Sequence, residues 1–216
     1  MNRNSIVQEY VTLATNEKGN LLSYYGLIGV VVSSITDLRL NGIVALENKK
    51  LEIKKNLPDE LHYLVSLYEY LLEKPRTMNK VMEDYFMGMT DKRAKRLMAD
   101  IGEALIADGF AVKGSGGIFG KKEVYTPVRE YKESLIAAVK AEIMQKEEWS
   151  VHDTSLVCIL QRTDSFKQYI SKYENKMLKA KWKAMKKDPK NKEVRDMMNY
   201  VDDTVAVMTA CIITIS

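Results

Sequence analysis

The chain twice ends an apolar helical segment at an Asn-Gly or Asp-Gly pair and then continues with strand periodicity. The two copies occupy residues 38–44 and 105–111. Glycine adopts a positive φ without strain, so each pair predicts a helix end followed by a β-hairpin. These patterns predict a mainly α, compact single-domain multi-helix fold with two short β-hairpins over residues 1–216. The repetition is a weak internal echo and not a solenoid, because it does not recur at a fixed period.

Helical periodicity and chain-breaking residues place the other elements. We expect helices over residues 5–14, 27–40, 58–74, 77–86, 90–107, 135–144, 154–187 and 193–213. The first hairpin pairs residues 43–46 with 51–53. The second pairs residues 110–112 with 124–125, and a glycine-rich loop over 113–122 joins them.

The composition limits the classes of partner. Hydrophobic residues make up 46% of the chain, enough for a sizeable core, and 33 basic against 29 acidic residues leave a net charge of +4. This balance favours anionic partners mildly and differs from a dedicated nucleic-acid coat protein. Residues 1–5 are polar and precede no apolar leader core, and the apolar runs 27–35 and 205–215 are shorter than the ~20 residues of a membrane span. We expect a cytoplasmic protein, with Cys158 and Cys211 as buried free thiols.

No pattern of catalytic residues is recognisable. His62 and His152 accompany neither a nucleophile motif nor paired metal ligands. Asp202 and Asp203 point to different faces of a helix, which suits a solvated surface better than an acid–base pair. We therefore expect a protein that is not an enzyme, with no cofactor and no metal.

The glycine-rich loop does not fit a nucleotide-binding motif. A phosphate-binding P-loop fails at Ser115 and Lys122, and the dinucleotide pattern fails at Phe119. Ile118 and Phe119 form instead an apolar pair beside Lys121 and Lys122. Such a tip is suited to insertion into a membrane interface or into the groove of a partner.

Two basic clusters also bear on function. Lys92, Arg93, Lys95 and Arg96 begin a helix, where the macrodipole disfavours cations, so a bound anion is one compensation and a solvated face the simpler interpretation. The lysine-rich segment 172–192 surrounds Trp182. This segment fits a helix lying on anionic lipid, but its apolar positions favour a helix with one face packed on the core.

Four segments in this order resemble the Golgi phosphoprotein 3 family. They are QEYVTLATNEKG (8–19), DLRLNGIVALE (37–47), the helix ending at Asp108-Gly109, and the hairpin GIFG to YTP (117–127). The resemblance implies a mostly helical domain. In eukaryotic members this domain binds phosphatidylinositol 4-phosphate, inserts the hairpin into Golgi membranes and links cargo enzymes to vesicle coats. The abundance of Lys, Asn and Ile is typical of a bacterial-type member.

The residues that form the lipid pocket in the family are not matched at the corresponding positions of this sequence. The pocket tryptophan falls near residues 22–24, which contain no Trp, and an arginine of the next helix falls at about Val31. Two further arginines fall near Lys95, beside Arg96, and near Met98. The resemblance therefore implies the fold and a membrane role but not one particular headgroup.

The first functional hypothesis is a non-catalytic peripheral membrane adaptor that binds anionic lipid headgroups. Lys92, Arg93, Lys95 and Arg96 would bind the headgroups, and the hairpin tip with Ile118, Phe119, Lys121 and Lys122 would insert. A winged-helix nucleic-acid binder over residues 77–127 is the alternative, against which the modest net charge and the resemblance weigh. The third hypothesis is a protein-binding scaffold that forms homo-oligomers through the 110–126 hairpin.

Overall fold

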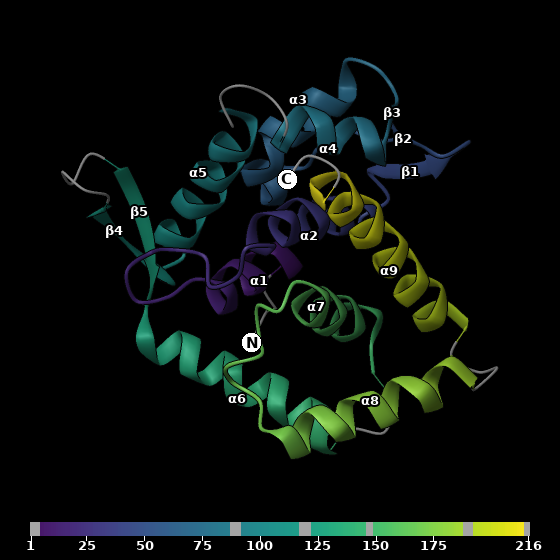
Figure 1. Ribbon diagram of the computed structural model, residues 1–216. Coiled ribbons are helices and arrows are strands. Elements are labelled where there is room, and N and C mark those ends of the chain that lie inside the picture. Colours follow the sequence, from purple (N-terminus) through teal and green to yellow (C-terminus); the bar gives the residue numbers. More distant parts are fainter. Residues whose placement is uncertain (1–4, 87–91, 117–121, 146–148, 188–191, 214–216) are drawn as a thin grey trace.

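The computed structural model describes residues 5–86, 92–116, 122–145, 149–187 and 192–213 (Figure 1). The helices are α1 (Ile6–Ala14), α2 (Gly26–Leu40), the 3-10 helix η1 (Asp59–Leu64), α3 (Val65–Leu72), α4 (Met78–Phe86), α5 (Lys92–Ala107), α6 (Arg129–Gln145), α7 (Val151–Arg162), α8 (Lys172–Lys187) and α9 (Lys192–Ile213). The strands are β1 (Val44–Glu47), β2 (Lys50–Ile53), β3 (Arg76–Thr77), β4 (Ala111–Gly116) and β5 (Lys122–Pro127). The predicted mainly α fold with short hairpins is therefore confirmed.

Helices α1, α2 and α7 form the centre of the molecule and supply much of its core (Figure 1). Every residue of α1 is buried, and a capping box of Ser5 and Gln8 begins the helix. Asp37 of α2 accepts two further hydrogen bonds from the first turn of α1, at 3.0 Å from Ile6 N and 2.9 Å from Val7 N. A nine-residue helix is marginal alone, so these bonds and its burial hold it in place.

The two Gly pairs end their helices as expected. Gly42 has a φ of +66° and Gly109 a φ of +74°, and the next residue in each case donates its backbone N–H back to the helix. The first pair leads into β1 and β2, whose two-residue turn at Asn48 and Lys49 also has positive φ values. β3 adds a third strand through Lys50↔Thr77 and Leu51↔Arg76, where the sequence predicted only the start of the helix over residues 77–86. Two residues are too short to show strand periodicity.

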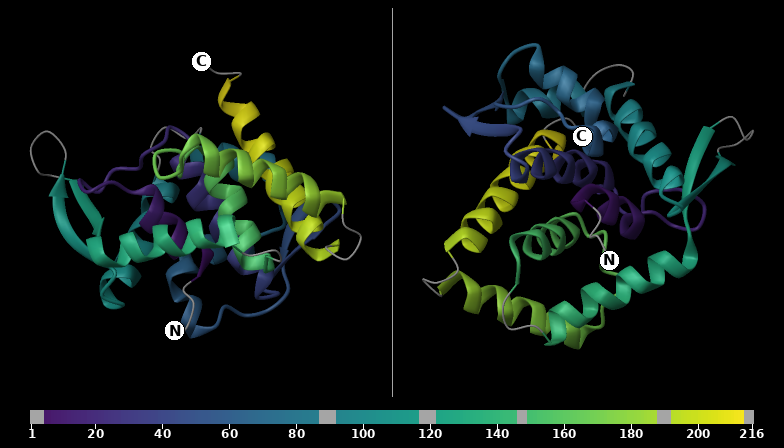
Figure 2. Two further views of the ribbon diagram at one scale, coloured as in Figure 1. Left: turned by 90° about the horizontal axis from the view of Figure 1, so that it is seen from below. Right: turned by 180° about the vertical axis from the view of Figure 1, so that it is seen from behind.

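The prediction of one long helix over residues 154–187 is wrong. α7 ends at Arg162, Asp164 has a φ of +54°, and α8 begins only at Lys172. The break returns the chain so that α8 lies beside α6 along one edge of the molecule (Figures 1 and 2). The strands β4 and β5 are also longer than expected and pair as far as Gly116↔Lys122.

The described helices differ from membrane spans in length or polarity. The longest, α9, has 22 residues but carries charged side chains at both its start and its middle. Across the described segments, no helix combines the length and the apolarity needed to cross a bilayer.

Candidate functional site

The four cations predicted to bind an anion lie within the first five residues of α5. They are all exposed, while Ala94 and Leu97 between and beside them are buried in the core. This amphipathic pattern fixes the start of the helix and directs the charges outward. We call this surface the basic end of α5, and it consists of Lys92, Arg93, Lys95 and Arg96.

Two of these cations contact α3. The guanidinium of Arg93 lies over the ring of Tyr70 at 4.9 Å, and Arg96 pairs with Glu69 at 3.4 Å. The side chains of Arg96 and Glu69 are 62% and 57% exposed, so this pair contributes less than about 1 kcal/mol and can be exchanged for a bound anion. Among the residues that the structure describes, Lys92 and Lys95 have no ion-pair partner.

The β4–β5 hairpin turns back beside α5. The turn at Gly109 reverses the chain, and Phe110 N bonds to Leu105 O at 2.7 Å. Lys113 and Tyr125 then contact Glu103 of α5 at 2.8 and 3.2 Å. α5 ends at the corner of the molecule from which the hairpin extends, and the helix and the hairpin diverge from that corner (Figures 1 and 2).

The predicted insertion residues are only partly within the described structure. Ile118, Phe119 and Lys121 lie outside the described residues, and Lys122 is described only as the first residue of β5. The strands that carry the tip project from the body of the molecule, and Val112 on β4 is 56% exposed.

The lipid-pocket positions implied by the family resemblance have unlike surroundings. Val31 is fully buried in the core, Tyr24 is 78% exposed and Lys95 is exposed on α5. A headgroup site on α5 is therefore inferred from its four exposed cations and not from the pocket residues of the family.

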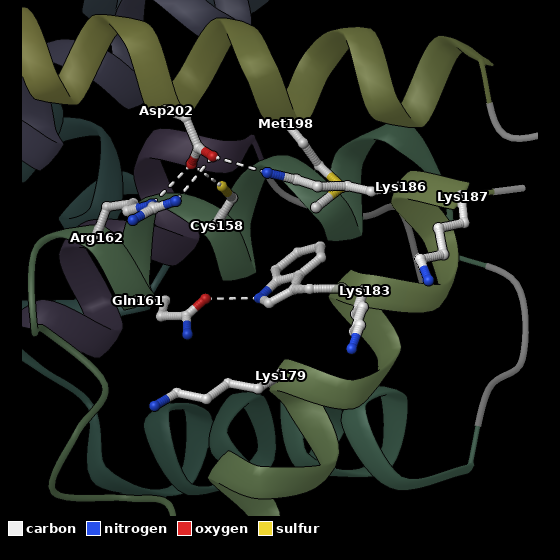
Figure 3. Close-up of a pocket in the computed structure, with 10 residues that line it drawn as sticks. Cys158, Gln161, Arg162, Lys179, Lys183, Lys186, Lys187, Met198 and Asp202 are labelled. Carbon is white, nitrogen blue, oxygen red and sulfur yellow. Dashed lines mark hydrogen bonds and ion pairs between the residues drawn. The ribbon is translucent and has the colours of Figure 1, made fainter.

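A pocket of about 430 Å³ opens between α7, α8 and α9 (Figure 3). Trp182 forms part of its wall, is only 8% exposed and packs edge-on against Trp149 with a 4.9 Å centroid separation. The core interpretation of this tryptophan is therefore confirmed. The pocket is lined by Cys158, Gln161, Arg162, Lys179, Trp182, Lys183, Lys186, Lys187, Met198 and Asp202.

A carboxylate joins the three helices at one side of this pocket. Asp202 of α9 accepts bonds from Arg162 Nε at 2.7 Å and Nη2 at 2.8 Å, and from Lys186 Nζ at 3.2 Å. Burial alone would raise the pKa of Asp202, but these two cations hold it below its ordinary value. The expectation that Asp202 lies on a solvated surface is wrong, because the carboxylate is partly buried within this ion network.

The thiol of Cys158 lies beside the same carboxylate. Burial raises the pKa of Cys158, and the negative charge of Asp202 raises it further. The thiol therefore stays protonated and donates to Asp202 Oδ1 at 3.4 Å. Cys158 is a buried free thiol as predicted, while the side chain of Cys211 lies outside the described part of the chain.

Three further cations line the pocket from successive turns of α8. Lys179, Lys183 and Lys187 are spaced four residues apart, are exposed and have no ion-pair partner among the described residues. The lysine spacing is visible in the sequence, but the pocket also needs Arg162 and Asp202, which lie 40 positions apart and meet only in the fold. Sequence reasoning found the lysines and missed the pocket.

The histidines have structural surroundings. His152 bonds to the buried carboxylate of Glu9 at 3.0 Å, and His62 is exposed. Within the described residues no group of three or more His, Cys, Asp and Glu side chains could hold a metal ion. No protein-family model matches the sequence, and no curated protein matches it significantly.

Proposed function

We propose that the protein is a non-catalytic peripheral adaptor that binds anionic membrane surfaces through the basic end of α5 and the tip of the β4–β5 hairpin. One observation carries this proposal. Lys113 and Tyr125 hold the hairpin strands to Glu103 of α5, so one continuous helix–hairpin unit carries the four cations and the strands that lead to the tip (Figures 1 and 2).

The magnitudes fit a reversible attachment. A basic side chain near an anionic membrane surface contributes about 1 kcal/mol. Burial of Ile118 and Phe119 in the interface would contribute roughly 1.5–3 kcal/mol each. Association also costs free energy because the protein loses translational freedom. Neither the charges nor the apolar tip alone offsets this cost, so binding requires both.

The resemblance to the Golgi phosphoprotein 3 family supports the same role. Two of its four segments are the end of α5 and the hairpin that projects beside it. Because the pocket positions differ, the proposed ligand is an anionic headgroup in general and not phosphatidylinositol 4-phosphate in particular.

Vesicle co-sedimentation tests the proposal. The wild-type chain should sediment with phosphatidylcholine vesicles containing phosphatidylserine and remain in solution with phosphatidylcholine alone. Lys92→Glu with Lys95→Glu should abolish sedimentation, and Phe119→Asp should weaken it. The glutamates suit the start of a helix, so the double variant is expected to fold.

The matched control reverses two exposed lysines of the β1–β2 hairpin, Lys49→Glu in its turn with Lys50→Glu at the start of β2. This control changes the net charge equally but lies away from α5 (Figure 1). Equal losses in the two double variants, or sedimentation independent of anionic lipid, would exclude the proposed surface. A gel shift with duplex DNA that disappears in Lys92→Glu with Lys95→Glu would support the winged-helix alternative instead.

The free edges of the projecting hairpin favour a second candidate function, self-association. β4 and β5 pair only with each other in the described sheet, so each presents an outer edge of backbone groups. Light scattering of the wild type against a variant with residues 112–126 replaced by a short Gly-Ser linker separates the two functions. A fall from oligomer to monomer, with vesicle binding retained, would support the scaffold.

A further inference from the structure

The pocket between α7, α8 and α9 is a second cationic surface, distant from the basic end of α5 (Figure 1). We propose that this pocket binds a compound carrying two or more phosphate groups. The proposal goes beyond membrane attachment, because it uses other elements and a concave site instead of a projecting surface.

The charge balance of the pocket is the first argument. Among the described residues, five cations and one carboxylate line it. Asp202 is shared between Arg162 and Lys186, so these three side chains together retain one positive charge. Lys179, Lys183 and Lys187 add three more without an ion-pair partner in the described residues. The pocket therefore presents about four uncompensated charges at neutral pH.

The arrangement of the lysines is unfavourable without a ligand. Like charges four residues apart on a helix repel one another by a few tenths of a kcal/mol per pair. The helix dipole compensates Lys186 and Lys187 in the last turn of α8, but it does not reach Lys179 and Lys183. A rise of 1.5 Å per residue places the Cα atoms of the three lysines about 6 Å apart along the helix, and their flexible side chains can converge on one ligand. A ligand with several anionic groups can therefore contact all three.

Gln161 adds a neutral donor directed into the same space. Its Oε1 accepts a 2.6 Å hydrogen bond from Trp182 Nε1. An indole N–H can only donate, so the oxygen must face the tryptophan and the amide N–H groups must face away from it. Figure 3 shows this nitrogen directed toward the ammonium of Lys179.

The residue types select phosphate over simpler anions. Asp202 holds the guanidinium of Arg162 by two bonds, so Arg162 is ordered before a ligand arrives. Lysines are mobile point charges that accept phosphate without a fixed planar geometry. The volume of about 430 Å³ is within the range of small-molecule pockets.

Isothermal titration calorimetry with inorganic tripolyphosphate at low salt tests the proposal, with inorganic phosphate for comparison. Tripolyphosphate should bind with one site per chain and much more tightly than phosphate. Tryptophan fluorescence should change on binding, because Trp182 is one of only two tryptophans and lines the pocket.

The decisive variant is Lys179→Gln with Lys183→Gln, which should weaken tripolyphosphate binding about tenfold or more through the loss of two charge-assisted contacts. The matched control is Lys172→Gln with Lys176→Gln, which removes two exposed lysines from the same helix outside the pocket. All four positions are solvent-exposed, so both variants should retain the wild-type circular dichroism. Equal weakening in both variants, or no binding by the wild type, overturns the proposal.

Two further arms identify the source of the phosphate groups. The first arm uses vesicles containing phosphatidylinositol 4,5-bisphosphate. If the protein binds them only with Lys179 and Lys183 intact, and tripolyphosphate displaces it from them, the ligand is a lipid headgroup. Soluble binding without such vesicle binding indicates a free phosphorylated metabolite. A single-stranded oligonucleotide could also bind tightly and depend on Lys172 and Lys176 as much as on Lys179 and Lys183. This result would overturn the proposed phosphate pocket and indicate a nucleic-acid surface along α8. Lys92→Glu with Lys95→Glu should leave tripolyphosphate binding intact, which separates this proposal from the membrane surface.

Discussion

A single hydroxyl group joins three distant segments in the core. Tyr10 Oη lies 3.1 Å from Gly26 O, 2.9 Å from Thr163 Oγ1 and 2.8 Å from Ser165 Oγ, and its side chain is fully buried. These bonds also fix the turn that separates α7 from α8. Removing the hydroxyl leaves buried polar atoms with fewer partners.

Tyr10→Phe should therefore lower the free energy of unfolding by about 1–3 kcal/mol in urea titration. Tyr24→Phe is the control, because Tyr24 is 78% exposed and its hydroxyl remains in water. We expect a change within about 0.5 kcal/mol for this control. A Tyr10→Phe variant as stable as the control would contradict the network.

Asp37 makes the stability depend on pH. Burial is the largest influence and raises its pKa from 3.8 to about 6, although the backbone N–H groups of Val7 and Ile6 lower it in part. Between these values the carboxyl is protonated in the folded chain and ionised in the unfolded chain. Its contribution to stability is therefore complete below about pH 4 and is lost as the pH rises through about 6.

Asp37→Asn removes this titration. The stability difference is the free energy of unfolding of the wild type minus that of the variant. It should fall by about 2.4 kcal/mol between pH 4 and pH 7. Urea titrations at four pH values measure the difference. Asp59→Asn, at an exposed position, should show no such trend. A difference that is constant or rises with pH would contradict the assignment to Asp37.

At the level of elements, the position of the hairpin depends on a glycine of α5. A Cβ atom at Gly102 would lie 2.3 Å from the ring of Tyr125, so only glycine allows β5 to pack this closely on the helix. Alanine would favour the helix by about 1 kcal/mol but would clash with the ring, and overpacking costs about 1–3 kcal/mol. The clash should exceed the gain in helix propensity.

Gly102→Ala should therefore destabilise the wild-type chain and stabilise the Tyr125→Ala chain, where the ring is absent. A double-mutant cycle by urea titration measures this reversal of sign. Gly102→Ala should also weaken vesicle binding by displacing the hairpin. The same sign in both backgrounds would show that Tyr125 does not pack on Gly102.

Elements set by local signals could be predicted, and those set by distant contacts could not. The end of α1 and the bounds of α2 agree with the predictions within a residue or two, because apolar periodicity and the Asn-Gly stop act within the segment. The break after α7 is different, since apolar residues such as Phe166 and Tyr169 continue the helical pattern through it. The hydroxyls of Thr163 and Ser165 stabilise that break by bonding to Tyr10, some 150 positions away. The pocket was missed for the same reason.

At the level of the whole molecule, contacts between distant segments favour cooperative unfolding of a single domain. α1 contacts α6 and α7, while α9 contacts α2, α4 and α7, so each region of the chain is packed against another. Both tryptophans lie at the edge formed by α6 and α8, whereas helical dichroism reports on all the helices.

If the fold is one cooperative unit, the two signals must change together. The urea midpoints from tryptophan fluorescence and from far-ultraviolet circular dichroism should then coincide. A Trp149→Phe variant, which leaves Trp182 as the reporter, should again give coincident midpoints at a lower stability. An earlier fluorescence transition would show that the edge with α6 and α8 unfolds separately. The proposed phosphate pocket would then be lost before the proposed membrane surface on α5, because the lysines of the pocket belong to α8.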